Sequence, residues 1–139
     1  MTHIDIWTDG ACSGNPGPAG WAAVLRCGKH EKSVVGGATE STNNRAELMA
    51  AIVSLEALKR PCNVTVHTDS QYVIGVMTTY KRKANHDLLV KLDALCKEHD
   101  VKFTHVRGHA GIENNERCDA LAKAEVERQR SIGKEVHGV

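Results

Sequence analysis

Apolar and polar positions alternate in several short runs of this chain, which is the pattern of half-buried β-strands. These runs cover residues 2–8, 21–27, 32–39, 64–68 and 101–106. A turn-rich stretch, SGNPGPAG at residues 13–20, separates the first two runs, and Gly28-Lys29 suits a tight turn before the third. We therefore expect the first three strands to form an antiparallel meander.

In other segments the apolar positions recur every three or four residues, as they do in helices with one buried face. The first of these segments follows Asn44 and Glu47, which have capping-box spacing, and it ends before Pro61. A short helix is expected to open at Ser70, and further apolar stripes predict helices over residues 88–96 and from Asn115 onward. The alternation of strands and helices after the meander predicts parallel strands joined by helical crossovers.

These elements predict an α/β domain in which a five-stranded mixed sheet, with three antiparallel strands and then parallel strands, carries helices on both faces. A length of 139 residues suits one domain with a substantial core. We assign residues 1–130 to this domain. Residues 131–139 are weakly patterned, and we expect them to form a mostly unstructured C-terminal tail.

Composition excludes several broad classes of protein. The net charge is +1, so no overall positive field favours a nucleic-acid partner, and the run Lys81-Arg82-Lys83 is short enough to be an ordinary solvated loop. The five cysteines are an odd number without the close pairs of structural zinc sites, which favours reduced thiols and a cytoplasmic protein. No apolar run approaches the roughly 20 residues of a membrane span, so we expect no membrane association.

Acidic residues end two of the predicted strands. Asp9 and Asp69 each follow a threonine and precede a small residue, at the edge of the sheet where ligands of α/β proteins bind. Glu47 and Asp119 fall near the starts of predicted helices and can face the same edge. Taken singly, each acid has an ordinary explanation as a turn, cap or helix-start residue. Together, four converging carboxylates indicate a site for divalent metal ions.

Four motifs stand in a characteristic order along the chain. They are TDGACSGNPGP at residues 8–18, TNNRAEL at 42–48, TDSQYV at 68–73, and GHAG at 108–111 with NERCD at 115–119. With these motifs the chain resembles type 1 ribonuclease H over roughly residues 1–128. The resemblance implies the ribonuclease H-like fold and endonucleolytic cleavage of the RNA strand of RNA/DNA hybrids, leaving 5′-phosphate and 3′-hydroxyl ends.

The resemblance also implies roles for particular residues. Asp9, Glu47, Asp69 and Asp119 match the four carboxylates that bind two Mg²⁺ ions, with Mn²⁺ as a substitute, and His109 matches a catalytic loop histidine. The implied contacts to the hybrid come from the backbone of one segment, from amide side chains and from a threonine that binds a DNA phosphate. These residues are Gly10, Ala11, Cys12, Asn15, Asn43, Asn44, Gln71 and Thr42.

Two departures from the family pattern concern substrate affinity. Many bacterial members carry a long basic protrusion where this chain has only residues 81–86, and Glu40 stands where some relatives have an arginine near the DNA phosphate. We therefore expect a weaker grip on the hybrid. Three other functions stay open at this stage: a non-catalytic hybrid-binding module, a different nuclease or strand-transfer enzyme on the same fold, and a reverse-transcriptase nuclease domain. We favour a free-standing monomeric enzyme.

Overall fold

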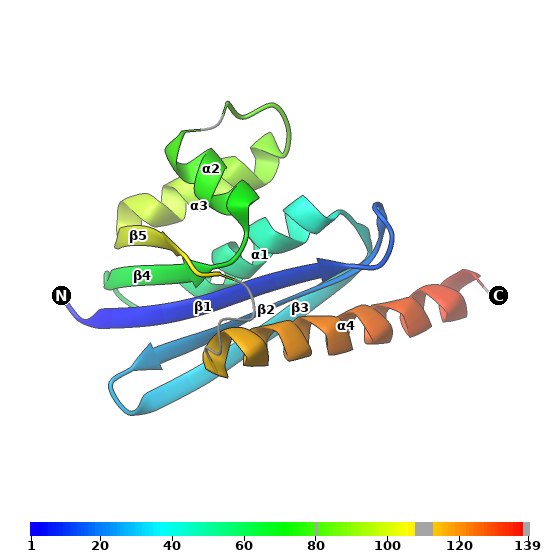
Figure 1. Ribbon diagram of the computed structural model, residues 1–139, viewed down its shortest axis with the longest axis horizontal. Coiled ribbons are helices and arrows are strands. Elements are labelled where there is room, and N and C mark those ends of the chain that lie inside the picture. The colour runs from blue at the N-terminus through cyan, green and yellow to red at the C-terminus, as the bar shows by residue number, and fades with distance from the viewer. Residues whose placement is uncertain (80, 108–112, 138–139) are drawn as a thin grey trace.

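The computed structural model of the chain describes residues 1–79, 81–107 and 113–137, and for residues 136 and 137 it describes only the backbone. The elements follow one another as β1 (His3–Cys12), β2 (Gly17–Cys27), β3 (His30–Ser41), α1 (Asn43–Glu56), β4 (Asn63–Thr68), α2 (Gln71–Thr78), α3 (His86–Glu98), β5 (Asp100–His105) and α4 (Glu113–His137). One five-stranded sheet holds the strands in the order β3-β2-β1-β4-β5 (Figure 1). The expected α/β architecture is confirmed.

The sheet is mixed, as expected. β1 pairs antiparallel with β2, and β2 pairs antiparallel with β3, which confirms the meander. β1 also pairs parallel with β4, and β4 pairs parallel with β5. The central strand β1 therefore has an antiparallel neighbour, β2, on one side and a parallel neighbour, β4, on the other.

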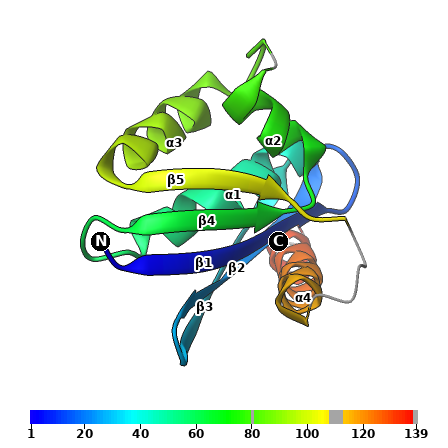
Figure 2. The ribbon, with the colours of Figure 1, turned by 60° about the vertical axis from the view of Figure 1, so that its left-hand side comes forward.

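Helices cover both faces of the sheet (Figure 2). On one face, α1, α2 and α3 enclose the larger core, in which Ile6 of β1 packs with Leu48 and Ile52 of α1. On the other face, α4 packs against β1 and β2 through Cys118, which lies in a smaller core with Trp7. Because neighbouring residues of a strand point to opposite faces, Ile6 and Trp7 serve these two cores in turn.

The approach of α4 to the sheet is unusually close at Gly20. A Cβ atom added at Gly20 would lie 2.4 Å from the carbonyl oxygen of Ala122 and 2.7 Å from the Cβ atom of Glu125. Atoms that are not bonded to each other do not approach this closely, so only glycine allows the helix to rest on β2 here.

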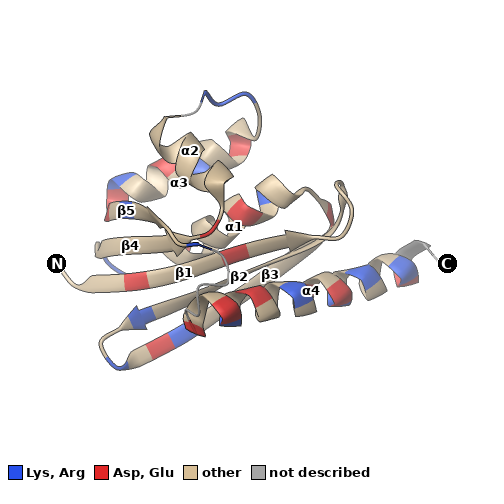
Figure 3. Ribbon diagram, in the orientation of Figure 1, with Lys and Arg blue, Asp and Glu red and all other residues tan. Residues whose placement is uncertain are grey.

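The expectation of an unstructured tail after residue 130 is wrong. Helix α4 runs without a break to His137, and Figure 3 shows basic and acidic residues alternating along it. Ion pairs at i, i+3 spacing join Arg128 to Glu125 and Arg130 to Glu127, and such pairs stabilise a helix whose apolar pattern has faded. Over the described ranges, we find no helix with both the length and the apolar character that crossing a membrane requires.

Candidate active site

Three of the four predicted carboxylates converge beside the central strand, where its parallel pairing with β4 ends. Asp9, Glu47 and Asp69 each offer a carboxylate oxygen, and these oxygens all lie within 4.8 Å of one another. They come from β1, from α1 and from the segment just after β4. Carboxylate oxygens at this spacing are suitable ligands for a hard divalent cation.

Strand register explains why Asp9 and Asp69 meet. The parallel ladder between β1 and β4 ends with the pair Thr8 and Thr68, so the next residue on each chain segment is an aspartate. On its other side β1 continues beyond this point, and Asp9 pairs with Ala22 of β2. Asp9 therefore lies inside a strand rather than at its end, where the sequence pattern had placed it.

Glu47 reaches the site because α1 lies directly on β1 at Gly10. A Cβ atom at Gly10 would stand 2.5 Å from the backbone carbon of Ala46 and 2.5 Å from the backbone nitrogen of Glu47. The Gly10 backbone N–H donates a hydrogen bond to Oε1 of Glu47 and lies 3.0 Å from Oδ1 of Asp9. Glycine at this position thus sets the separation of two carboxylates.

Burial and mutual repulsion favour protonation of the cluster. Asp9 is only 6% exposed, and its burial, followed by the negative charges of Glu47 and Asp69, raises its pKa to about 9. Burial is also the main cause that raises the pKa of Glu47 to about 7, although hydrogen bonds from Gly10 and Ser70 oppose that rise. Without a cation, the site holds a proton at neutral pH in place of positive charge.

Asp119 approaches the same site from α4. Its side chain hydrogen-bonds with Asp9, and this contact contributes to the raised pKa of Asp9. Its carboxylate also forms an ion pair with Lys123, with 3.0 Å between Nζ of the lysine and Oδ2 of Asp119. Among the described residues, the tightest group of possible ligands contains the other three acids and not Asp119. The structure therefore places Asp119 next to Asp9 at the border of the cluster.

The local structure also removes the ordinary explanations of these acids. The N-cap of α1 is Thr42, whose Oγ1 accepts a hydrogen bond from the Arg45 amide at 3.2 Å, so the expected capping box of Asn44 and Glu47 is wrong. The N-cap of α2 is Ser70 and not Asp69. Because α4 already begins at Glu113, Asp119 lies beyond the first turn of its helix.

Several predicted substrate-binding residues gather at the start of α1. The side-chain oxygen of Asn15 accepts a hydrogen bond from the Asn43 amide at 3.0 Å, which joins the β1–β2 loop to the helix. Asn43 and Asn44 are both exposed. Glu47 lies one helical turn further along α1, about 6 Å by helix geometry.

The other predicted contacts are more varied. Gln71 is exposed as the first residue of α2, two positions after Asp69. Cys12 is half-buried, and its thiol lies 3.4 Å from the carbonyl oxygen of Ser41. Ala11 packs against the core beneath α4. His109 lies outside the described residues.

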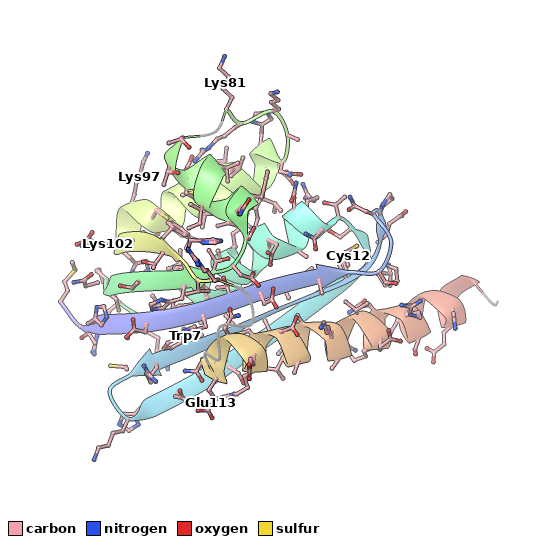
Figure 4. The ribbon with its side chains drawn as sticks, in the orientation of Figure 1. Trp7, Cys12, Lys81, Lys97, Lys102 and Glu113 are labelled. Atoms are coloured by element: carbon pink, nitrogen blue, oxygen red, sulfur yellow. The ribbon has the colours of Figure 1, made fainter. Side chains whose placement is uncertain are left out.

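The basic run after α2 divides into two kinds of side chain. Arg82 turns inward, where its Nε donates to the carbonyl oxygen of Val76 at 3.1 Å and its guanidinium pairs with Asp93. Lys81 and Lys83 are exposed, and Lys81 points away from the molecule in Figure 4. This loop therefore presents two free cations to a ligand rather than three.

Sequence reasoning missed three polar residues around the site. Ser70 hydrogen-bonds with the Glu47 carboxylate, and Arg130 donates a hydrogen bond to the hydroxyl of Ser13. The sequence indicates Ser70 as an N-cap, since serine is common there, but it does not indicate the hydrogen bond to Glu47. No local signal connects Ser13 with a residue 117 positions later.

The acidic cluster adjoins exposed residues, although Asp9 and Glu47 are themselves buried. A hollow of about 420 Å³ does exist elsewhere, between the start of β1 and the residues that follow α1, and none of the predicted site residues line it. The acids lie near the exposed starts of α1 and α2. Acids bordered by exposed amides and lying away from that hollow suit a large polymeric ligand better than a small molecule enclosed in a pocket.

Comparison with known proteins places the chain in a family. The family model described as RNase H matches residues 1–127. The ribonuclease H of Bordetella bronchiseptica is 50% identical, with 92% of each chain covered. The ribonuclease H of Phenylobacterium zucineum is 54% identical, covering 87% of this chain and 88% of that protein.

Solved structures agree with this placement. RNase H1 from the halophilic archaeon Halobacterium salinarum superposes with a TM-score of 0.74 at 33% identity, covering 91% of this chain and 98% of the other. LC11-RNase H1, solved in complex with an RNA/DNA hybrid, gives a TM-score of 0.71 at 30% identity, with coverages of 90% and 97%. With the fold, the acidic cluster and these similarities together, the chain belongs to the ribonuclease H family, type 1.

Proposed function

We propose that this protein hydrolyses the RNA strand of RNA/DNA hybrids endonucleolytically, leaving 5′-phosphate and 3′-hydroxyl ends, with two divalent metal ions. The observation that carries the proposal is the convergence of Asp9, Glu47 and Asp69 within 4.8 Å. Family membership and the relative that was solved with an RNA/DNA hybrid support the choice of substrate.

The residues present suit Mg²⁺, with Mn²⁺ as a substitute. All the donors are carboxylate oxygens, which hard cations prefer. Two carboxylates about 4 Å apart repel each other by about 4 kcal/mol at an effective dielectric near 20, and a phosphodiester adds further negative charge. Asp9, Glu47 and Asp69 would hold such ions, whose positive charge would offset this repulsion and would supply Lewis-acid activation of water and stabilisation of the departing 3′-oxygen.

Each acid has a distinct place in this proposal. Asp9 interacts with Glu47, Asp69 and Asp119, so it is the acid that would share metal binding with each of the others. Glu47 and Asp69 would contribute the nearest further carboxylates, and Asp119 would contribute a fourth beside Asp9. We assign His109 to proton transfer or product release, because imidazole titrates near neutral pH.

Selectivity for hybrids requires groups that recognise the 2′-hydroxyl, which distinguishes RNA from DNA. We assign this role to the backbone of Gly10, Ala11 and Cys12 and to four amide side chains: Asn15, Asn43, Asn44 and Gln71. Since Oδ1 of Asn15 already accepts from the Asn43 amide, its side-chain NH₂ is the group left for substrate. Amides recognise hydroxyl groups without adding charge.

Thr42 is proposed to bind a phosphate of the DNA strand. Its Oγ1 accepts a hydrogen bond from the Arg45 amide, which fixes the side chain and leaves the hydroxyl hydrogen to donate. The start of α1 adds further favourable potential, because helix N-termini attract anions. Thr42 therefore combines a fixed donor with a helix end that suits phosphate.

One assay tests the reaction and its substrate. Purified protein is incubated with RNA/DNA, RNA/RNA, DNA/DNA and single-stranded RNA of the same sequence, with Mg²⁺, with Mn²⁺ or with a chelator. Cleavage of the hybrid alone, abolished by the chelator, supports the proposal. Binding without cleavage indicates a hybrid-binding module, whereas cleavage of DNA duplexes indicates a different nuclease on this fold.

We further propose that the enzyme acts as a monomer in the cytoplasm. The five cysteines are free thiols, two of them buried, as suits a reducing compartment. Sedimentation of the purified protein tests the oligomeric state: a mass near 15.1 kDa is expected.

A further inference from the structure

We propose that Arg130 is a positioning residue for substrate binding, which holds the β1–β2 loop in place against the start of α1. This inference rests on the proposed function, because its consequence is measured on an RNA/DNA hybrid. The central observation is a hydrogen bond of 2.6 Å from Nη2 of Arg130 to Oγ of Ser13. It joins the late part of α4 to a loop that carries a proposed substrate contact.

Contacts within the loop connect Ser13 with Asn15, so the position of one depends on the position of the other. The Ser13 amide donates to the carbonyl oxygen of Pro18 at 2.9 Å, which closes the loop at its base. A Cβ atom at Gly17 would lie 1.9 Å from the carbonyl oxygen of Ser13, so the two sides of the loop are in close contact. At its tip, Asn15 accepts the hydrogen bond from Asn43.

Arg130 is itself held by the packing of α4 on the sheet. The neighbouring Gln129 is 6% exposed and donates to Glu125 at 2.9 Å, and a Cβ atom at Gly37 would meet both of these side chains at 2.8 Å. The Nε atom of Arg130 is buried and has no hydrogen-bond partner among the described residues. Burial of Nε without a partner costs free energy, and the hydrogen bond from Nη2 to Ser13 forms despite that cost.

This contact comes from the part of α4 that follows the match to the family model. The family model matches residues 1–127, and Arg130 lies on the helical extension that follows. The structure thus assigns a use to the late part of α4: it fixes the loop that presents Asn15, with the path Arg130 to Ser13, through the loop to Asn15, and then to Asn43. A fixed loop binds its ligand with less loss of conformational entropy.

The experiment compares Arg130→Ala, Ser13→Ala, the double variant and Arg130→Lys with the unmodified chain. KM for an RNA/DNA hybrid is expected to rise about 5- to 10-fold in each alanine variant, the range for loss of one hydrogen bond of ordinary strength, while kcat changes less than about twofold. The double variant is expected to equal the single variants, because both remove the same contact. Arg130→Lys should show a smaller rise in KM than Arg130→Ala, because a lysine can still donate a hydrogen bond to Ser13.

Arg128→Ala is the matched control. Arg128 lies two residues away on the same helix and carries the same charge, and among the described residues its ion-pair partner is Glu125 of the same helix. Its KM should stay within about twofold of the unmodified chain, and the salt dependence of hybrid binding should be unchanged in both arginine variants. If Arg130→Ala instead lowers the salt slope by about one and adds to Ser13→Ala, Arg130 contacts a phosphate directly and the positioning role is rejected.

A second measurement does not depend on catalysis. Hydrogen exchange of the Asn43 amide reports the bond to Asn15, and it should be faster in Arg130→Ala and unchanged in Arg128→Ala. Unaltered exchange in Arg130→Ala would overturn the inference whatever the kinetics show. A chain that cleaves no hybrid would overturn the proposed function, while faster exchange at Asn43 would still support the link to Arg130.

Discussion

The backbone amide of Gly10 donates a hydrogen bond to the side chain of Glu47. This hydrogen bond adds to the apolar packing between the central strand and the helix that covers it, at the place where the carboxylates gather. The amide also approaches Asp9, so one N–H group serves two acids of the site. The spacing of the proposed metal ligands thus depends on how closely a helix backbone rests on a strand.

The first prediction concerns the absence of a side chain at Gly10. Gly10→Ala should lower the free energy of unfolding by about 1–3 kcal/mol, since the added Cβ atom would stand 2.5 Å from the backbone of α1. The helix must move away from β1, so activity should fall more than stability suggests. Thermal unfolding and hybrid cleavage measure the two effects.

Gly133→Ala is the control for that substitution. Gly133 lies within α4, and a Cβ atom there would meet nothing within 4 Å. Alanine should raise helix stability by about 0.5–1 kcal/mol and leave cleavage unchanged. Equal destabilisation by both substitutions would show that contact with α1 is not what makes Gly10 necessary.

The second prediction separates catalysis from stability at Asp9. Asp9→Asn should reduce cleavage by more than about 100-fold, the upper end of what losing a group that merely orients a metal ligand costs. The metal-free protein should be as stable as the unmodified chain or more stable, because the substitution removes a buried, repelled carboxylate. Denaturant unfolding in chelator measures this, and a clear loss of stability would mean that Asp9 has a structural role instead.

The third prediction is that stability without metal falls as pH rises from about 4 to about 9. Burial and neighbouring charges raise the folded-state pKa of Asp9 to about 9 and that of Glu47 to about 7, above their ordinary values of 3.8 and 4.5. In this window the folded state binds more protons than the unfolded state, so the free energy of unfolding decreases with pH. Thermal unfolding between pH 5 and pH 9 in chelator measures the slope.

Two controls belong to that pH series. Asp9→Asn removes the group with the largest shift and should flatten the curve. Mg²⁺ should stabilise the unmodified chain most at high pH, where the carboxylates are free to bind it, and it should have little effect on Asp9→Asn. A metal-free curve that rises through this range would contradict the proposed protonation of the cluster.

The fourth prediction links Glu31 with Asp119. Glu31 on β3 accepts hydrogen bonds from Asn114 at 3.2 Å and from Arg117 at 3.1 Å, and so ties the first turns of α4 to the sheet just before Asp119. Glu31→Ala should raise the Mg²⁺ concentration for half-maximal cleavage about two- to threefold, a modest effect because exposed ion pairs contribute at most about 1 kcal/mol. Lys32→Ala, at the next position of β3, should leave the metal requirement unchanged.

The fifth prediction concerns the basic run in the loop between α2 and α3, which Figure 3 shows in blue. Lys81→Ala and Lys83→Ala should weaken hybrid binding slightly and reduce its salt slope by about one each if these side chains reach phosphates. Arg82→Ala should instead destabilise the fold, since its side chain bonds to Val76 and Asp93. The salt series and thermal unfolding distinguish these effects.

Hybrid affinity as a whole tests the expected effect of the missing protrusion. With two exposed lysines in this loop, the chain should bind a hybrid more weakly than a relative that carries the long basic segment. Equal dissociation constants at matched salt would reject this expectation and would show that contacts at the starts of α1 and α2 suffice.

Local patterns in the sequence determined most of the fold. Alternation predicted the strands, and helical spacing predicted a helix with one buried face after Asn44, where Leu48 and Ile52 lie in the core; these periodicities follow directly from backbone geometry. The positions of Asp9, Glu47 and Asp69 in the motifs predicted that these acids converge. The tail was mispredicted because a charged helix with little apolar periodicity looks like a disordered segment.

The tertiary structure alone decided how these residues act on one another. The pairing of Thr8 with Thr68 brings Asp9 beside Asp69, and the contact of Gly10 with α1 sets the position of Glu47. Local pattern assigned Glu47 to a capping box, and it contains nothing that connects Arg130 with Ser13. Register, close backbone approach and burial arise between segments far apart in the chain, so they become visible only when those segments are packed together.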